Sequence, residues 1–352
     1  MKFSLIFFSC EIKQTNNIYQ FVLDVAKCAD RNNFDNIWVP ERHFSKFGGA
    51  FTNPPLMLSA IAANTKRLGL RAGSFISPLH HTVRAAENWS FVDNLSKGRI
   101  GISFGSGWNI NDFIFFPERY EQRQAYMYSQ IETIKDLWRG GKLIFKNTYN
   151  KPFEVTLCPK PFQPDLPIWI TTSGHPETYK SAAKYDANIL THMINQDLVL
   201  LEERIHLYKQ TLIDNNFDPN SKEITLMLHT YIDETEELIR NVTYKPFREY
   251  LREAVNLENQ AAAGGGSISG GLKSKSQEIP VDLMEELLDI TYEKYCKNAS
   301  LIGTSDQCSK FIDKIKSIGV TEIASLIDFG LTGSNIMHSL NKLISIKENF
   351  KR

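Results

Sequence analysis

Residues 168–192 read IWITTSGHPETYKSAAKYDANILTH, and this stretch contains one complete unit of strand, turn, helix and strand. The apolar run 168–172 predicts a buried strand, and the Ser-Gly pair after it predicts a turn. Residues 177–185 then predict a helix, and residues 188–192 predict the next strand. Two strands joined through a helix normally lie parallel in one sheet, so the unit is typical of an α/β protein.

The same alternation extends in both directions along the chain. Further apolar runs predict strands at residues 2–9, 36–40, 70–76, 99–104, 223–232 and 322–328. Amphipathic stretches predict helices at residues 18–33, 56–68, 83–95, 120–138, 198–215, from about 235 onward, and at 335–349. Eight strands alternating with eight helices favour a closed (β/α)8 TIM barrel over an open sheet. The 352 residues suit a single domain, 1–352, of this kind.

Two insertions interrupt the alternation. After the fourth helix, residues 140–167 are rich in proline and show no helical period, and part of them predicts a hairpin of 142–145 against 153–158. Before the eighth strand, residues 260–277 read QAAAGGGSISGGLKSKSQ, a Gly/Ser-rich composition that buries too little surface to fold alone. This second segment is interpreted as a disordered surface insertion or, alternatively, as a mobile lid over the barrel mouth.

The amino-acid composition indicates which kinds of binding partner to expect and in which cellular compartment. Lys and Arg total 40 and Asp and Glu also total 40, and this balance argues against a mainly electrostatic nucleic-acid or membrane partner. An odd number of cysteines without a CxxC pair argues against a disulfide framework or a zinc knuckle. The apolar N-terminal run is too short for a signal peptide, and no span is long enough to cross a membrane. We therefore expect a cytoplasmic protein.

Polar and small residues gather where the predicted strands end. In (β/α)8 barrels the active site is built at these carboxyl ends, so their sequences are the ones to compare. They are PERH at 40–43, GSFIS at 73–77, SFGSGW at 103–108, TTSGH at 171–175, LTH at 190–192 and LHT at 228–230. The strand interiors, by contrast, are apolar, and this contrast predicts one site at the barrel mouth.

Three histidines lie at these strand ends. His43 follows Glu41 and Arg42, and such a histidine acts either as a general base or donor to a cofactor carbonyl, or as a loop histidine bonded to a neighbour. His192 and His229 leave the same alternatives open. Together the three converge on one cavity, but none has the spacing of a metal motif, so no metal site is expected.

Two glycine-containing turns suit a flat phosphorylated ligand. Gly105, Ser106, Gly107 and Trp108 offer close backbone approach on one side and an aromatic wall on the other, or else they form an ordinary tight turn. The turn at 173–178 is followed by the first turn of a helix, whose free N–H groups and positive dipole end favour a phosphate. The alternative for this second turn is a plain helix cap.

These residues resemble a known family. The segments WVPERHF at 38–44, FGG at 47–49, NP at 53–54, PLHHTVRAAE at 78–87 and DNLSKGR at 93–99 are similar to luciferase-like monooxygenases. GISFGSGWNINDF at 101–113, with 190–192 and TLMLHT at 225–230, most resembles the subgroup found in polyketide and nonribosomal-peptide assembly lines. The resemblance runs from Lys2 to about Leu343 and implies the bacterial luciferase type of barrel.

The resemblance also implies FMN at the carboxyl-terminal mouth of the barrel. Gly73 and Ser74 resemble the strand-three pair whose unusual peptide bond lies under the isoalloxazine, and Glu41 resembles the acidic residue beside the flavin. Ser173, Gly174 and Thr178 resemble the turn that holds the phosphate. The complete set expected to bind the cofactor is Glu41, Gly73, Ser74, Gly105, Ser106, Trp108, Thr172, Ser173, Gly174, His175 and Thr178.

Two departures from luciferase affect the catalytic assignment. Bacterial luciferase has two consecutive histidines after the glutamate, the first of them catalytic, but Arg42 stands in that place and His43 matches the second. Luciferase also has a reactive cysteine and an arginine where this chain has Gly105 and Ser106. Light emission from a long-chain aldehyde is therefore not expected. The catalytic candidates are His43 first, then His192, with Arg42 beside them.

The resemblance implies a reduced-FMN-dependent monooxygenase of secondary metabolism that uses O2 and is supplied by a flavin reductase. Its substrate would be a polyketide or peptide intermediate, free or tethered to an acyl or peptidyl carrier protein, modified by hydroxylation or Baeyer–Villiger oxygen insertion. Helices two and three commonly form dimer faces in this family, which implies a homodimer. The alternatives are a deazaflavin-dependent dehydrogenase and a non-catalytic flavin-binding or docking module of a synthase.

Overall fold

The computed structural model describes residues 1–9, 11–194, 196–263 and 281–350. Eight parallel strands close into a barrel, because each pairs with the next along the chain and the last pairs with the first. They are β1 (Lys2–Ile6), β3 (Asn36–Val39), β4 (Gly69–Ile76), β5 (Ile100–Gly105), β8 (Ile168–Thr171), β9 (Asn188–His192), β10 (Ile224–Asp233) and β12 (Glu322–Leu326). All eight predicted strands are confirmed, with shifts at their ends.

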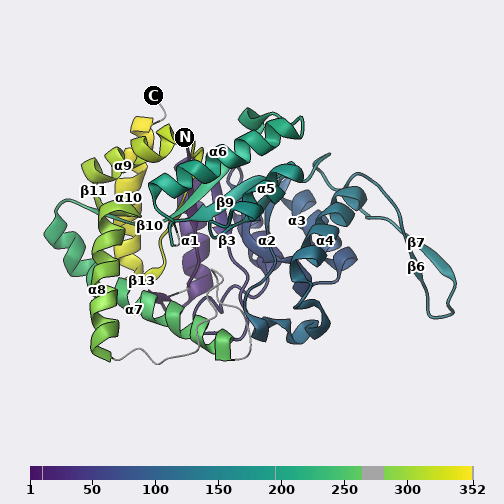
Figure 1. Ribbon diagram of the computed structural model, residues 1–352, viewed down its shortest axis with the longest axis horizontal. Coiled ribbons are helices and arrows are strands. Elements are labelled where there is room, and N and C mark those ends of the chain that lie inside the picture. Colours follow the sequence, from purple (N-terminus) through teal and green to yellow (C-terminus); the bar gives the residue numbers. More distant parts are fainter. Residues whose placement is uncertain (10, 195, 264–280, 351–352) are drawn as a thin grey trace.

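Eight helices follow these strands in turn and surround the barrel (Figure 1). They are α1 (Ile18–Arg31), α2 (Pro54–Asn64), α3 (Thr82–Ser96), α4 (Arg123–Trp138), α5 (Pro176–Lys184), α6 (Leu198–Asp214), α7 (Glu236–Ala263) and α10 (Gly333–Phe350). The local sequence determines where several helices begin. Asn17, Asn53 and Asp197 accept hydrogen bonds from the first N–H groups of α1, α2 and α6. The predicted (β/α)8 barrel is therefore confirmed.

The region between β10 and β12 differs from the prediction. It contains α8 (Val281–Asn298), β11 (Leu301–Thr304) and α9 (Ser305–Ser317), none of which the sequence pattern indicated. β11 lies outside the barrel and pairs with residues 230–233 of β10. The predicted Gly/Ser-rich insertion 260–277 began too early, because 260–263 form the end of α7, where alanine favours a helix. Residues 264–277 lie outside the described part of the chain.

The insertion after α4 contains the predicted hairpin. β6 (Leu143–Lys146) pairs antiparallel with β7 (Pro152–Val155), and the two strands project from the side of the molecule (Figure 1). A second small parallel pair, β2 (Glu11–Lys13) with β13 (Phe329–Thr332), lies beyond the ends of β1 and β12. Short 3-10 helices complete the described elements: η1 (Ser77–Leu79), η2 (Ile110–Phe115), η3 (Pro117–Arg119) and η4 (Pro219–Ser221).

A single buried carboxylate, that of Glu322, links four strands inside the barrel, near the amino-terminal ends of the strands. Glu322 Oε1 accepts hydrogen bonds from Asn36 Nδ2 at 2.8 Å and Trp38 Nε1 at 3.2 Å, and also from the Ser4 hydroxyl. Glu322 Oε2 accepts from Thr225 Oγ1 at 2.6 Å. Because these donors belong to β1, β3 and β10, the carboxylate of β12 joins three other strands.

Two tryptophans fill the barrel above this carboxylate. Trp38 and Trp169 pack edge to face with their ring centroids 5.4 Å apart, and the Arg71 guanidinium lies 5.0 Å from the Trp169 ring. Glycine is required around them: a Cβ at Gly101 would lie 2.5 Å from the Trp169 ring, and one at Gly73 2.8 Å from Trp38. The two tryptophans therefore fill the barrel at this level, and the candidate site lies at the strand ends above them.

We predict that Glu322→Ala lowers the free energy of unfolding by roughly 3 kcal/mol or more, because it leaves several buried donors without an acceptor. Urea unfolding of the parent and the variant measures the difference. Glu249→Ala, which removes an exposed ion pair with Lys13, is the matched control and is expected to change stability by less than about 1 kcal/mol. Equal stabilities for Glu322→Ala and the parent would show that the carboxylate does not hold the strands together.

Candidate active site

The carboxyl ends of the barrel strands lie at the end of the molecule opposite the two chain termini, and α7 runs across that end (Figure 1). Tyr250 of α7 packs against Phe47, from the loop after β3, with ring centroids 5.2 Å apart. Phe247 of α7 packs against Phe329, just beyond β12, at 5.6 Å. One side of the mouth is therefore walled by aromatic rings.

Glu41, in the loop after β3, organises the mouth. Its carboxylate is fully buried, and Oε1 accepts from His80 Nε2 at 2.6 Å and from His43 Nε2 at 3.1 Å. Oε2 accepts from the Ile76 N–H at 2.8 Å. Burial alone would raise the pKa of Glu41, but the charge of His80 and the three hydrogen bonds outweigh it and hold the pKa below its ordinary value. Glu41 is thus a carboxylate engaged by three protein donors.

This arrangement fixes the tautomers of both histidines. An ionised carboxylate only accepts hydrogen bonds, so His43 and His80 must each carry a proton on Nε2. The Nδ1 atom of His43 is consequently the position that can accept a proton. His80 is held by stacking on Phe75 at 4.4 Å and by its carbonyl, which accepts from Gln130 at 3.0 Å. The sequence prediction did not single out His80, although it follows a strand end.

Arg42 reaches over the barrel mouth. Its guanidinium lies 5.2 Å from the Phe8 ring, 5.4 Å from Phe47 and 5.9 Å from Trp108. Phe8 follows β1 and Trp108 follows β5, so the side chain spans between the ends of separated strands. Gly48 has a φ of +81°, and a Cβ there would lie 2.8 Å from Arg42 Cδ. The loop after β3 therefore needs glycine at 48 to wrap around this arginine.

Asp112 of η2 is a second buried acid at the mouth, and its position in the sequence did not predict this. Its Oδ1 accepts from Asn109 Nδ2 at 3.0 Å. Burial raises the pKa of Asp112 to about 6, with a further increase from Glu41, while the charges of His43 and Arg42 act in the opposite direction. The mouth thus holds two carboxyl groups whose pKa values shift in opposite directions. The pKa of Glu41 is lowered, and that of Asp112 is raised to about 6.

The predicted flavin-facing residues of β4 and β5 lie together. The Gly73–Ser74 peptide bond is cis, in agreement with the unusual bond that the resemblance implied. Ser74 Oγ lies 2.6 Å from Thr171 Oγ1, which in turn lies 2.7 Å from Ser103 Oγ, so hydroxyl groups of three adjacent strands are joined. A Cβ at Gly105 would be 3.1 Å from Ser74 Cβ. Ser106 follows Gly105 and is partly exposed.

The turn between β8 and α5 has the features of a phosphate site. Gly174 has a φ of +103° and its N–H donates to Thr172 Oγ1 at 3.2 Å, while its carbonyl accepts from Arg204 Nε at 3.2 Å. The next residue, His175, caps α5 by accepting the Glu177 N–H at Nδ1. A cation therefore stands beside a helix N-terminus. The other two predicted residues of this turn, Ser173 and Thr178, are both half-buried.

His192 and His229 come together on adjacent strands but are poor bases. Burial lowers the pKa of His192 to about 4, and burial together with His192 lowers that of His229 to about 3, so both are neutral at pH 7. His192 Nδ1 accepts the Ile194 N–H at 3.2 Å, which leaves its proton on Nε2 as a donor. This argues against His192 as the proton acceptor. His229 is enclosed by the rings of Phe247, Tyr250, Tyr295 and Phe329.

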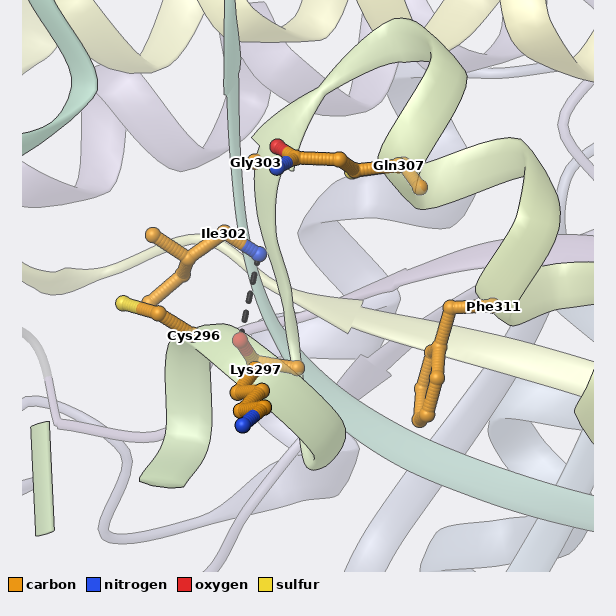
Figure 2. A pocket seen from close by; sticks show the side chains of 8 residues that line it. Cys296, Lys297, Ile302, Gly303, Gln307 and Phe311 are labelled. Carbon is orange, nitrogen blue, oxygen red and sulfur yellow. Dashed lines mark hydrogen bonds between the residues drawn. The ribbon is translucent and has the colours of Figure 1, made fainter. Parts of the chain in front are cut away.

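A separate cavity of about 140 Å³ lies outside the barrel, among α8, β11 and α9 (Figure 2). Two thiols line it, and burial raises the pKa of Cys296 to about 11 and of Cys308 to about 12, so neither is a ready nucleophile. In the described ranges, no group of three or more His, Cys, Asp or Glu side chains has the arrangement of a metal site. Within those same ranges no helix has the length and apolar character needed to cross a membrane.

The structure is a (β/α)8 barrel, and its polar side chains gather at the carboxyl ends of the strands, where barrel enzymes build their active sites. Residues 1–322 match the family model of the luciferase-like monooxygenases, so the chain belongs to that family and is a flavin-dependent monooxygenase. The oxygenase component of the flavin-dependent trigonelline monooxygenase of Acinetobacter baylyi is 25% identical over 347 residues, which cover 93% of this chain and 88% of that protein.

Solved structures agree on the fold. The monooxygenase RslO1 from Streptomyces bottropensis superposes with a TM-score of 0.78 at 20% identity, over the full length of both chains. The FMN-bound oxygenating constituent of 3,6-diketocamphane monooxygenase from Pseudomonas putida, a type II Baeyer–Villiger monooxygenase, gives a TM-score of 0.74 at 16% identity. That match covers 97% of this chain and 96% of the other.

We predict that His43→Ala slows product formation about 100-fold or more, the usual effect of losing a positioned acid or base. Folding and flavin binding should remain nearly unchanged, because Glu41 keeps its hydrogen bonds from His80 and the Ile76 N–H. Single-turnover assays and flavin titrations measure the two effects. His206→Ala, which changes an exposed histidine on α6, is the control. If His43→Ala turns over like the parent, His43 is a structural histidine.

Proposed function

We propose that the protein is a monooxygenase that binds reduced FMN at the barrel mouth and uses O2 to modify a natural-product intermediate. The observation that carries the choice of FMN is the turn between β8 and α5. There the N-terminus of a nine-residue helix and the Arg204 side chain, anchored on the Gly174 carbonyl, lie side by side. A terminal phosphate monoester suits this pair of features, because the helix end and the guanidinium both favour negative charge.

The residues at the mouth would divide the remaining work. The joined hydroxyls of Ser74, Thr171 and Ser103, with the glycine backbone at 73 and 105, would position the flat ring of the cofactor. Reduced FMN supplies the electrons that activate O2. The aromatic wall formed by Phe47 and Tyr250 would exclude water from that chemistry. His43, held by Glu41, would accept or return a proton at Nδ1.

The substrate proposal rests on the subgroup resemblance at residues 101–113, 190–192 and 225–230. We propose a polyketide or peptide intermediate, free or bound to an acyl or peptidyl carrier protein. The reaction would be hydroxylation next to a carbonyl or Baeyer–Villiger oxygen insertion. The aromatic rings around the mouth support a large apolar substrate. A separate flavin reductase is proposed as partner, because the Acinetobacter relative is the oxygenase component of its system.

The cofactor proposal makes a prediction about Arg204. The parent should bind FMN more tightly than FAD, and reduced FMN more tightly than oxidised FMN, in calorimetric titrations. Arg204→Ala should weaken FMN roughly 10-fold, the value of one charge-assisted hydrogen bond, and leave riboflavin, which lacks the phosphate, unchanged. Arg84→Ala, an exposed arginine of α3, is the matched control.

Four outcomes would contradict this assignment. Equal or tighter binding of FAD would exclude the proposed phosphate contact, and so would equal loss of FMN and riboflavin in Arg204→Ala. Tighter binding of a deazaflavin, together with hydride transfer and no O2 uptake, would instead identify a deazaflavin-dependent dehydrogenase. Flavin binding without any turnover would identify a binding or docking module.

We also propose a homodimer that is formed through α2 and α3. α2 contains no charged residue, although it lies on the outside of the barrel. Leu56 of α2 is 70% exposed, and Phe91 and Leu95 of the adjacent α3 are 62% and 44% exposed. Apolar side chains gathered on neighbouring helices are typical of an interface. A second copy of the chain would cover them.

We predict that Phe91→Glu converts a dimer into a monomer without unfolding it, because a charge in an apolar interface core lacks a partner. Light scattering during gel filtration gives the mass, and circular dichroism checks the fold. Val199→Glu changes an equally exposed apolar residue on α6 and should leave the mass unchanged. A parent protein that is already monomeric at micromolar concentration would disprove the proposed dimer.

A further inference from the structure

His192 and His229 are two histidines of the mouth that have no task in the function proposed above. They lie on adjacent strands, because His192 of β9 pairs with Met227 of β10 and His229 follows two residues later. In the part of the chain that the structure describes, His192 Nε2 has no hydrogen-bond partner. His229 Nε2 is buried and is likewise unpaired among the described residues. Since a buried polar atom without a partner is costly, the two rings indicate a place where a polar group binds.

The alternation of side chains along β9 directs His192 toward the inside of the barrel. Leu190 faces inward, because its Cδ2 lies 3.1 Å from where a Cβ at Gly73 would be. Thr191 faces outward, where the Tyr179 hydroxyl of α5 donates to its Oγ1 at 3.1 Å. Successive side chains of a strand point to opposite faces. His192 therefore shares the inward face of Leu190 and lies one step closer to the mouth.

His229 faces the same side from β10. Thr225 points inward, because its hydroxyl donates to the Glu322 carboxylate inside the barrel at 2.6 Å. Residues two and four positions further along the strand keep that direction, so Met227 and His229 also face inward. The two histidines thus lie on the barrel side of the aromatic wall. The rings that contact His229 come from α7, α8 and β13, and they are those of Phe247, Tyr250, Tyr295 and Phe329.

A backbone hydrogen bond determines which nitrogen of His192 carries the proton. Nδ1 accepts the Ile194 N–H at 3.2 Å, so the proton of the neutral ring is on Nε2. Gln196 stabilises the same turn, because its Nε2 donates to the His192 carbonyl at 2.6 Å and to Thr191 Oγ1 at 2.9 Å. The His192 side chain is partly exposed, and the surrounding protein lowers its pKa to about 4. His192 is therefore a neutral hydrogen-bond donor held in one orientation.

We propose that His192 donates its Nε2–H to the carbonyl oxygen of the substrate and thereby orients the substrate at the mouth. The residues proposed to hold the flavin lie on β4, β5, β8 and the turn after β8, whereas His192 and His229 lie on β9 and β10. His229 contacts the aromatic rings of α7, the side proposed above for an apolar substrate. A carbonyl takes part in both reactions proposed above, so this assignment rests on that function. The flavin ring also has carbonyl oxygens, and the experiments below separate the two sources.

A neutral imidazole suits this task. In oxygen insertion a nucleophile derived from O2 adds to the carbonyl carbon, and in hydroxylation a proton leaves the neighbouring carbon, with His43 Nδ1 as the proposed acceptor. In both reactions the electron pair of the C=O bond moves onto the oxygen. The Nε2–H of His192 stabilises this negative charge through a hydrogen bond, and its own N–H bond does not break. An uncharged ring can polarise a carbonyl without giving up its proton.

Two substitutions separate the donor from the turn that holds it. An asparagine amide reaches only as far as Nδ1 of histidine, so His192→Asn can still accept the Ile194 N–H but has no donor at the position of Nε2. Glutamine is longer by one methylene, so His192→Gln places an amide N–H near that position. We expect His192→Asn to fold like the parent and to lose the contact with the carbonyl, and His192→Gln to keep that contact. His206→Ala, an exposed position on α6, is the control.

NMR of the ¹⁵N-labelled histidines follows the contact directly, in the flavin-free protein and after saturation with oxidised FMN. The signal that is absent from His192→Asn should show a proton on Nε2 and should stay neutral from about pH 8 down to about pH 5. Cyclooctanone should shift this signal, whereas methylenecyclooctane, with a CH2 group in place of the oxygen, should not.

Three NMR results would overturn the proposal. The first is a His192 ring that is charged at pH 7 or protonated on Nδ1. The second is an equal response of the signal to the two probes, including no response to either. The third is a shift on adding FMN alone with no further change on adding cyclooctanone, which would assign the donor to a flavin carbonyl.

Affinity and turnover complete the test. The ratio of the affinities for cyclooctanone and methylenecyclooctane should fall roughly 10-fold in His192→Asn, the value of one hydrogen bond, and should stay near the parent ratio in His192→Gln and His206→Ala. FMN affinity should be the same in all four proteins. If cyclooctanone contacts His192 but reduced FMN and O2 oxygenate no ketone, the proposed function fails and the carbonyl site stands. If the enzyme oxygenates ketones and His192→Asn leaves kcat, KM and the affinity ratio unchanged, the carbonyl contact fails alone.

Discussion

The structure depends on one carboxylate buried inside the barrel. Moving Glu322 out of water is costly, and the four donors that surround it, together with the charge of Arg71, offset that cost. Those donors link β12 to β1, β3 and β10, and thereby fix how these strands are positioned along the barrel relative to one another. Two of them, Asn36 and Trp38, lie on β3, the strand that ends just before Glu41. The Glu322 carboxylate therefore anchors the strand that leads to Glu41.

Much of the fold was predictable from the sequence, because the barrel strands are mostly apolar and are buried by helices outside and side chains inside. The segment between β10 and β12 was not. A Gly/Ser-rich stretch there predicted an interruption of the strand–helix alternation, and the sequence pattern did not predict α8, β11 and α9. These elements pack through contacts with other parts of the chain. The alanines at 261–263 illustrate the difficulty, since they serve equally well in a linker or at the end of a helix.

The candidate site was predictable in position but only partly in content. Strand ends identified Glu41, His43 and the turn before α5, because that information is local. His80 and Arg204 were missed, since each acts through a residue at least 30 positions away. The low pKa of His192 was equally hidden, because burial is a property of the whole fold. The sequence pattern identifies residues that lie at strand ends. It does not identify residues that reach the site only through tertiary packing.

The substitution of arginine for luciferase's first histidine has a consequence for the whole mouth. A histidine in that place can take up a proton, whereas Arg42 carries a fixed positive charge at every relevant pH. That charge lies among the rings of Phe8, Phe47 and Trp108, where the surroundings screen it poorly. Proton exchange must then fall to other groups, and a fixed cation makes a neighbouring carboxyl easier to ionise. The arginine and a titrating acid beside it are therefore complementary parts of one electrostatic arrangement.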